Sequence, residues 1–203
     1  MTLARRNGPD AVTLREATRM AGVSPNAAYR HFADVADLIA AVQLEALAEL
    51  TAAMRAELSK VRQTGKPDRD AMARLRALGA GYLAFALAQP GLFAAAFVRL
   101  RTGGPVPSTD PKEADFVVVS GEPVVSPYRL LHLVISEMDQ AGCLRGGDVG
   151  TATLIAWADV HGLAQLLGGA LAAIPASSRN DLIDATLTAT LTGLSAPAGI
   201  AAE

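Results

Sequence analysis

Apolar residues recur at helical spacing over much of the chain, and this pattern predicts a fold built from helices. Over residues 34–62 they are separated by threes, fours and fives, the spacing of one helix face. This stripe comprises Leu38, Ile39, Val42, Leu47, Leu50, Met54 and Leu58. Further helices are predicted over residues 1–7, 69–88, 92–100, 126–141, 148–173 and 178–194. With little sustained alternation of apolar and polar positions, the predicted fold class is all-α.

Residues 102–127 interrupt this pattern, because clusters of glycine and proline leave no helical period there. Phe116–Val119 has the composition of a strand, but we expect no second strand to pair with it. We therefore interpret the segment as a long loop, of a length that usually has a function.

Two short helices joined by a tight turn are predicted near the N-terminus. Thr13 can cap a helix over residues 14–21, and Gly22 permits the left-handed conformation that ends one. Val23 is expected to anchor the turn in the core. Ser24 and Pro25 then signal a second helix start, with residues 26–31 following. The spacing is that of a helix-turn-helix, whose second helix enters the DNA major groove.

The residues themselves carry a resemblance. Ala21-Gly22-Val23-Ser24, followed by Tyr29, His31 and Phe32, resembles the DNA-binding domain of the tetracycline-repressor-like (TetR) family. Two later segments, residues 81–97 and 157–166, resemble the C-terminal regulatory domain called WHG, whose letters are Trp157, His161 and Gly162 here.

The resemblance implies a helix-turn-helix DNA-binding domain over residues 1–46 and a helical regulatory and dimerisation domain over residues 47–203. The first helix is shorter than the family's, and Val35 stands where the family usually has a phosphate-contacting lysine. Fewer phosphate contacts are therefore expected.

Charge is distributed unevenly along the chain, whose formal net charge is −2. Residues 1–33 contain five arginines against two acidic side chains, so the remainder has 13 basic and 18 acidic side chains. A basic head on an acidic body is what a phosphate-binding module attached to a non-binding domain should show.

Few residues of the sequence bear on the cellular compartment of the protein or on a catalytic or metal site. A single cysteine, Cys143, fits a reducing compartment, and no signal segment is recognised, so a cytoplasmic protein is expected. The longest apolar stretch, residues 152–174, is interrupted by polar side chains and predicts a buried helix, with no membrane partner. The histidines and Cys143 lack the spacing of a zinc site. No nucleophile elbow or phosphate loop occurs, so we expect no enzyme, metal or cofactor.

Candidate DNA contacts follow from the expected recognition helix. Pro25, Asn26, Ala27 and Arg30 are expected to face base edges. Asn26 could pair with adenine, and Arg30 with guanine or a phosphate. Thr13, Tyr29 and His31 are expected to contact phosphates, which position the head without reading sequence.

A small-molecule site is expected among the helices that surround the ligand cavity in TetR-like proteins. Its candidate wall is Tyr82, Phe85, Phe93, Phe97, Met138, Trp157 and His161. Each could instead simply fill core. His161 shares a helix face with Trp157 and could bond a ligand or hold helices together. The second alternative is favoured, since buried polar groups usually pair within the protein.

The predicted function is a ligand-responsive regulator of transcription, a repressor released from its double-stranded DNA operator by an apolar small molecule. The last two helices are expected to pair in a homodimer through Leu187 and Leu191. Residues 102–127 could form the lid of the ligand pocket. The alternative is a DNA-independent helical sensor or scaffold with a degenerate DNA-binding head.

Overall fold

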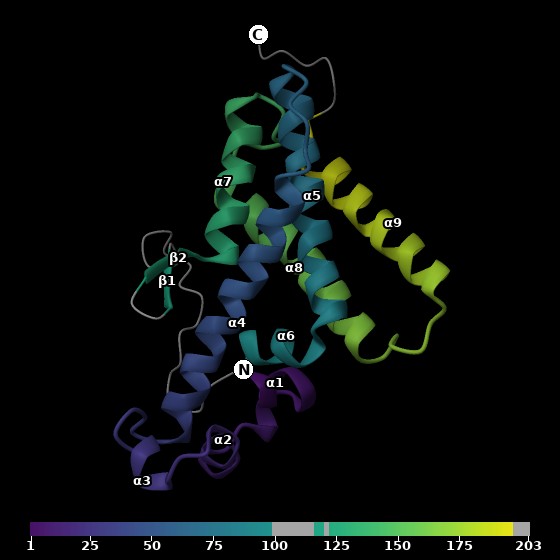
Figure 1. Cartoon of the computed structure of the whole chain (residues 1–203). Coiled ribbons are helices and arrows are strands. Elements are labelled where there is room, and N and C mark those ends of the chain that lie inside the picture. Colours follow the sequence, from purple (N-terminus) through teal and green to yellow (C-terminus); the bar gives the residue numbers. More distant parts are fainter. Residues whose placement is uncertain (99–115, 120–121, 197–203) are drawn as a thin grey trace. The chain divides into compact units, whose positions relative to one another are not determined.

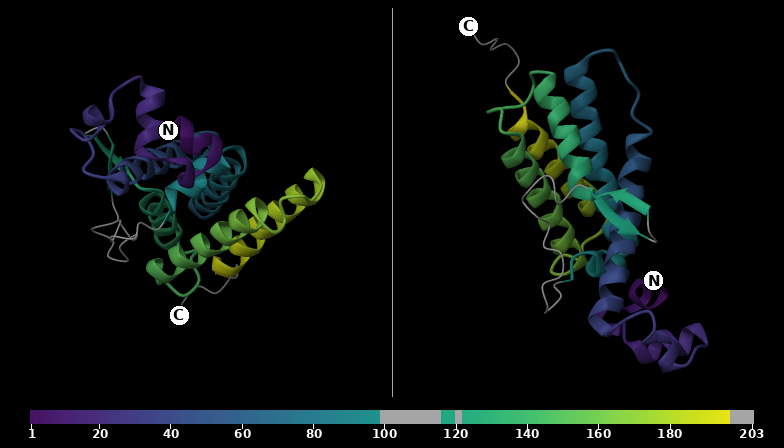
Figure 2. Two further views of the ribbon diagram at one scale, coloured as in Figure 1. Left: turned by 90° about the horizontal axis from the view of Figure 1, so that it is seen from below. Right: turned by 90° about the vertical axis from the view of Figure 1, so that its left-hand side faces the viewer.

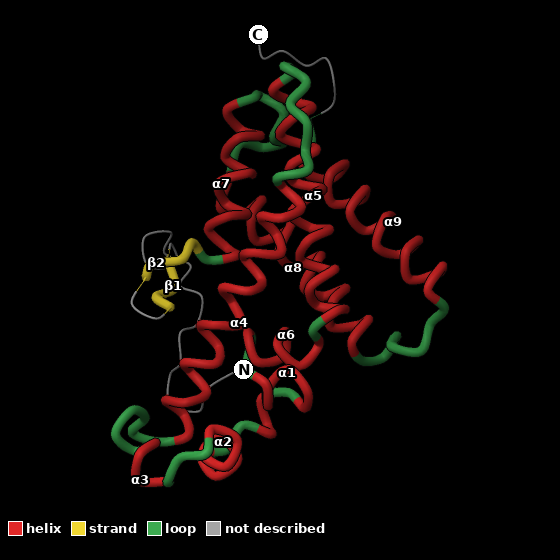
Figure 3. The backbone as a smooth tube through the Cα atoms, in the orientation of Figure 1, coloured by secondary structure: helices red, strands yellow, loops and turns green. Residues whose placement is uncertain are grey.

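The computed structural model describes residues 1–98, 116–119 and 122–196, and it shows an all-α fold (Figures 1 and 3). The helices in order are α1 (Thr2–Asn7), a 3₁₀ turn η1 (Pro9–Ala11), α2 (Leu14–Ala21), α3 (Pro25–Ala28), α4 (Val35–Leu58), α5 (Pro67–Ala88), α6 (Pro90–Ala96), α7 (Pro127–Gln140), α8 (Val149–Gly168) and α9 (Ala176–Leu194). The expected all-α class is confirmed.

The helices divide into two compact units. The first unit consists of Met1–Leu50 and Ala88–Ser126, and the second of Thr51–Leu87 and Pro127–Glu203. Helix α4 is continuous across the division between Leu50 and Thr51. The predicted domain division after residue 46 stays a prediction.

In the first unit, α1 packs against α6 with almost no space between their backbones. A Cβ atom built on Gly91 would lie 2.2 Å from the carbonyl oxygen of Ala4, so only glycine fits at this crossing. Ala4 itself is completely buried. At the other side of α1, Arg5 makes a two-pronged hydrogen bond to the Glu49 carboxylate of α4, at 2.8 and 3.0 Å. These contacts fix α1 between α4 and α6.

The second unit is a bundle of the later helices, held by polar pairs as well as core side chains. Helix α8 packs against both α7 and α9, and Figure 2 shows α8 and α9 lying side by side. Arg74 of α5 forms a bidentate pair with Glu137 of α7, at 2.6 and 3.1 Å. Arg76 of α5 bonds Asp184 of α9 at 2.7 Å. The apolar side of α5 is buried: Leu75, Leu78, Tyr82, Phe85 and Ala86.

Several helix ends differ from the sequence prediction. Helix α8 was expected to reach residue 173 but ends at Gly168, where the Leu171 N–H bonds the Leu166 carbonyl and closes the helix. Two consecutive glycines, each about 1 kcal/mol less favourable in a helix than alanine, outweigh the helix-forming alanines that follow. Helix α4 ends at Leu58 rather than residue 62, in a tightened turn over Ser59–Val61.

Three other helices begin earlier than expected, each directly at or after a proline. Helices α5 and α6 start at Pro67 and Pro90, whereas the sequence prediction placed their starts at residues 69 and 92. Helix α9 starts at Ala176 after Pro175, and not at Ser178. Proline fits the first helical turn, where its missing N–H would have no intrahelical partner.

The prediction that Phe116–Val119 has no partner strand is wrong. It forms β1 and pairs antiparallel with β2 (Glu122–Val125), with Val118 opposite Pro123 (Figure 2, right). The proline concealed β2 in the sequence, because proline is excluded from central strands but tolerated in an edge strand. Both strands of a two-stranded hairpin are edges. The predicted lid, residues 102–127, lies mainly outside the described residues.

Candidate functional site

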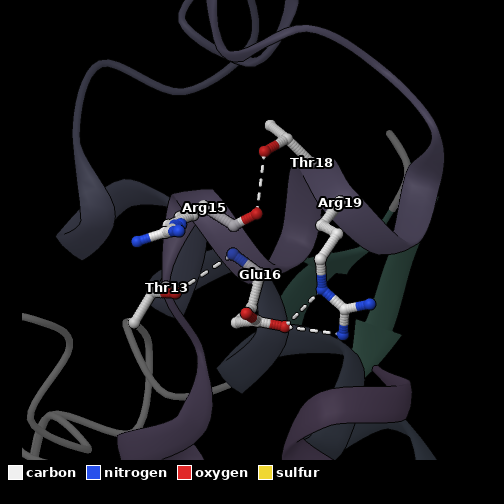
Figure 4. A network of polar contacts seen from close by, with 5 residues as sticks. All are labelled: Thr13, Arg15, Glu16, Thr18 and Arg19. Carbon is white, nitrogen blue, oxygen red and sulfur yellow. Dashed lines mark hydrogen bonds and ion pairs between the residues drawn. The ribbon is translucent and has the colours of Figure 1, made fainter.

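Helix α2 starts where the sequence predicted, and its first turn is fixed by side chains (Figure 4). The Thr13 hydroxyl accepts the Glu16 N–H at 3.2 Å, so Thr13 is the N-cap. Glu16 also pairs with Arg19 one turn on, at 2.8 Å, and this hydrogen bond and charge raise the pKa of Arg19. The Thr18 hydroxyl donates to the Arg15 backbone carbonyl, and the Arg15 side chain points away from the network (Figure 4).

The turn between the two short helices also follows the prediction. Gly22 has a φ of 67°, the left-handed conformation, and its N–H closes α2. The Ser24 hydroxyl then accepts the Ala27 N–H at 3.3 Å at the start of α3. The structure thus forms the predicted helix-turn-helix. Val23 does not anchor the turn as expected, since 47% of its side chain is exposed.

The second helix is shorter than expected. Helix α3 ends at Ala28, and Tyr29, Arg30 and His31 lie in the turn that follows it. Arg30 and His31 donate their N–H groups to carbonyls three residues earlier, so the turn continues the helical path. Asp34 then caps α4 by accepting the Asp37 N–H at 2.9 Å.

Most predicted DNA-contacting side chains are accessible. Thr13, Asn26, Arg30 and His31 are exposed, and Tyr29 is 60% exposed, whereas Ala27 is half-buried. The side chain of Pro25 lies outside the described part of the structure. Asn26 lies in the first turn of α3, and Tyr29, Arg30 and His31 follow this helix directly. The N-terminal residues of the second helix are those that contact base edges in a helix-turn-helix.

Ala27 and His31 also line a cavity of about 200 Å³ within the head. Its other walls are mostly small or apolar: Leu14, Ala17, Thr18, Ala21, Val23, Ala28, Phe32 and Leu38. The alanines leave this space because no larger side chain fills the gap between the two short helices.

Ion pairs determine which arginines of residues 1–33 remain available to contact a DNA phosphate. Arg5 is paired with Glu49 and Arg19 with Glu16. Arg6, Arg15 and Arg30 are exposed and form no ion pair with an acidic residue among those described. The sequence analysis counted Arg15 only as a charge. Its place on the solvent face of α2 makes it a phosphate-contact candidate that the amphipathic pattern of α2 could have identified.

The second unit contains a cluster of aromatic side chains in which Tyr82 has the central place. Its hydroxyl lies 2.7 Å from Nδ1 of His161, and the Trp157 indole N–H donates to it at 3.4 Å. Burial raises the pKa of Tyr82 and lowers that of His161, so a neutral phenol and a neutral imidazole are both favoured. Which of the two groups donates in the Tyr82–His161 hydrogen bond depends on the imidazole tautomer.

The geometry of His161 agrees with the structural alternative considered in the sequence analysis. The amide nitrogen of Gln165, on the next turn of α8, lies 3.3 Å from Nε2 of His161, so both ring nitrogens face polar groups of the protein. Asp159 is directed elsewhere, as expected, and accepts the Thr190 hydroxyl at 2.7 Å.

Two members of the aromatic cluster were missed by the sequence analysis. Tyr128 of α7 meets the Trp157 ring edge to face, with ring centroids 5.9 Å apart. His132, one turn later on α7, stacks on Tyr128 at 6.4 Å. The spacing of four residues between Tyr128 and His132, like that between Trp157 and His161, was a signal that could have identified them.

The remaining predicted ligand contacts are not all joined to this cluster. Phe85 is 6% exposed and lies one turn beyond Tyr82 on α5. Met138 is completely buried, ten residues after Tyr128, which is about 15 Å along a helix. Phe93 and Phe97 belong to the first unit, where their rings pack edge to face at 5.1 Å.

Helices α8 and α9 expose apolar side chains, but not those expected on α9. Leu187 is buried within the protomer, where it packs against Gly79 of α5 so closely that a Cβ there would lie 2.4 Å from its Cδ2. Leu182 of the same helix is 38% exposed, because it lies five residues before Leu187 and points to a different side. The buried position of Leu187 does not fit its predicted place in a dimer interface. The exposed members are Leu154, Ile155 and Leu166 of α8 and Leu182 of α9.

Searches for other kinds of site are restricted to the described residues. They contain no group of three histidine, cysteine or acidic side chains that could hold a metal ion. None of their helices taken singly is long and apolar enough for a membrane span, although α5 and α6 would qualify by length and composition if counted together as one bent pair.

A helix-turn-helix with exposed polar and basic side chains, joined by α4 to a helical bundle, defines a DNA-binding regulator. Two family models match the chain. The model described as "Bacterial regulatory proteins, tetR family" matches residues 1–42, and "Tetracyclin repressor-like, C-terminal domain" matches residues 75–190. The chain belongs to the tetR family of DNA-binding transcriptional regulators, which are not enzymes.

The fold is also found in a solved structure of a protein of unknown function from Rhodococcus sp. RHA1. It is 27% identical to this chain, and the alignment covers 96% of this chain and 91% of that one, with a TM-score of 0.71. No curated protein matches the chain. The relative's description adds no ligand or operator.

Proposed function

We propose that this regulator is a homodimeric, cytoplasmic repressor of the WHG-type subgroup that an apolar small molecule releases from its operator. The proposal rests on two features that occur together in this chain. A helix-turn-helix head exposes Asn26, Tyr29 and Arg30, and the second unit contains a cluster of half-buried aromatic side chains around the buried Tyr82.

DNA reading is assigned to the side chains around α3. Asn26 and Arg30 read base edges, with Pro25 and Ala27 close to the bases, because an amide and a guanidinium match adenine and guanine. Thr13, Tyr29 and His31 contact phosphates, and Arg15 joins them as a cation with no ion-pair partner among the described acidic residues.

Dimerisation is assigned to α8 and α9. Four large apolar side chains of these helices are 38–49% exposed, and Gly162 and Gly168 leave open space that permits close helix approach. Two copies of this face related by a two-fold axis would form a four-helix bundle. The two heads would then read half-sites about 34 Å, one helical turn of DNA, or a multiple apart.

The effector site is proposed within the second unit, among Tyr82, Phe85, Met138, Trp157 and His161. Phe93 and Phe97 form a separate aromatic pair in the first unit and stay candidate contacts from the sequence. Apolar walls with few polar groups are typical of small-molecule sites. A movement caused by the effector would be transmitted through α6. Only Gln89 separates α6 from α5, and α6 packs on α1 of the first unit. An effector that favours one position of α6 would shift the head with it.

A gel shift with the DNA upstream of the regulator's own gene tests the proposal. Wild type should retard this DNA, and Arg30→Ala should weaken the complex, since it removes a base contact and a cation together. If no duplex, including fragments of the surrounding genome, is bound above non-specific affinity, the alternative of a DNA-independent sensor or scaffold is correct instead.

A further inference from the structure

The cavity of the DNA-binding head lies wholly within the first unit. Its volume is about 200 Å³, and its walls come from α2, from α3 with the turn after it, and from the start of α4. The inner wall includes the buried side chains of Leu14, Thr18 and Leu38. Other lining side chains, among them Val23 and His31, are exposed, so the cavity opens to solvent at their side. A small molecule can therefore enter without any helix unfolding.

The inner part of this cavity offers few partners to water. Among the lining residues that the structure describes, only Thr18 and His31 have polar side chains. The Thr18 hydroxyl donates to the Arg15 carbonyl at 2.9 Å, so its proton is already used. A buried water needs roughly two to four polar partners, whereas a cavity lined by apolar side chains stays dry. An apolar occupant is therefore favoured over water at the inner wall.

The volume of the cavity matches one aromatic ring. A cavity of about 150 Å³ lined by leucine, isoleucine and phenylalanine takes up benzene. The cavity of the head is somewhat larger, and its walls include Leu14, Leu38 and the ring of Phe32. The additional space admits one small substituent on the ring, such as a methyl or hydroxyl group.

The cavity adjoins the residues proposed to contact DNA. Ala27 and His31 are part of its lining, and Arg30 lies between them in the chain. A molecule bound in the cavity would touch the end of α3 and the turn after it directly. Its influence on DNA binding would need no movement transmitted from the second unit.

We propose that this cavity is a second small-molecule site, and that it takes a neutral molecule with one aromatic ring, unsubstituted or with one small substituent. A charged ring is disfavoured, because the inner wall contains no charged side chain to pair with it. The site is separate from the effector site proposed in the second unit and does not depend on that assignment. Because the molecule would contact α2, α3 and α4 together, its binding stabilises their arrangement in the head.

A titration of full-length wild type with toluene tests the site. The leucine and valine methyl groups are labelled with carbon-13 and followed by NMR. Signals of Leu14, Val23 and Leu38 should shift together and saturate with one dissociation constant. The signals of Leu133, on the exposed surface of α7, should stay in place. The proposal is overturned if toluene causes no saturable shift, or if the shifts are confined to methyl groups of the second unit.

A cavity-filling variant shows whether the empty volume itself is required. Ala28→Leu places a larger side chain in the cavity wall, and Ala56→Leu makes the same change on the exposed surface of α4 outside the head. Ala28→Leu should bind toluene at least ~10-fold more weakly, about 1.4 kcal/mol, and Ala56→Leu should bind it as wild type does. Wild-type affinity in a folded Ala28→Leu would overturn the proposal.

The test stays decisive if Ala28→Leu does not fold. Ala17→Leu then fills the same cavity from α2, and it should weaken toluene binding to the same extent. The methyl shifts of wild type locate the probe independently of any variant. All of these measurements use the protein without DNA. Failure to bind an operator would therefore refute the proposed repressor function and leave the result at the cavity unaffected.

Discussion

Replacing Gly91 by alanine tests the packing that holds α1 on α6. The added methyl group would lie 2.2 Å from the Ala4 carbonyl oxygen and 2.8 Å from that of Arg5, closer than Cβ atoms are found to approach other heavy atoms. Both obstacles are backbone atoms. The Ala4 oxygen also accepts the Gly8 N–H at 2.8 Å, which closes α1, so it cannot move without disturbing that helix end.

The expected magnitude follows from two opposing effects. Alanine is favoured over glycine in a helix by roughly 0.5–1 kcal/mol. Overpacking a buried contact costs about 1–3 kcal/mol. We expect Gly91→Ala to lower the free energy of unfolding by about 1–2 kcal/mol, which for a chain of this size is a fall in Tm of about 2–8 °C.

Gly150→Ala is the matched control. It makes the same chemical change within α8, where the added Cβ would lie an ordinary 3.5 Å from Asp148 Oδ1. Its stability should equal or exceed that of wild type. Urea and thermal unfolding are compared at one protein concentration, because the Tm of a dimer depends on it. The packing argument is refuted if Gly91→Ala is as stable as wild type.

Three further predictions address charge, pH and assembly. Arg15→Gln should reduce the slope of log affinity for DNA against log salt by ~0.9 per head in fluorescence anisotropy, and an unchanged slope would exclude a phosphate contact. Burial lowers the pKa of His161 below its unfolded value of about 6.5, so wild type should lose stability as pH falls below 6.5. Urea titrations of His161→Gln should lack this loss, and an identical loss in both proteins would contradict the assignment. Ile155→Asp should halve the mass measured by light scattering. Leu133→Asp, on exposed α7 surface, should leave the dimer intact, and a monomeric wild type would rule out the proposed interface.

Local signals in the sequence predicted the elements that hold the DNA-binding head together. Thr13 and Gly22 act as the expected helix caps because a cap depends on bonds within three or four residues. The same reasoning overextended α8, since it gave the alanines after Gly169 more weight than the two glycines that end the helix.

Contacts between distant segments could not be predicted in this way. Tyr82 and His161 are 79 residues apart, and nothing in either local sequence indicates that their side chains bond. Leu187 was assigned to a dimer face because its helix has an apolar stripe, but only the position of Gly79 shows that it is core.

Selection from a pool of random DNA duplexes at about 0.15 M salt tests the central claim of sequence-specific operator binding most directly. Wild type should enrich a two-fold symmetric motif whose half-site centres lie about 10 base pairs, or a multiple of this spacing, apart. Asn26→Ala should enrich a motif with relaxed preference at one position of each half-site, because one amide contact to adenine is lost. Recovery of duplexes with no common motif by wild type would contradict the account, because the exposed residues around α3 would then not read DNA sequence.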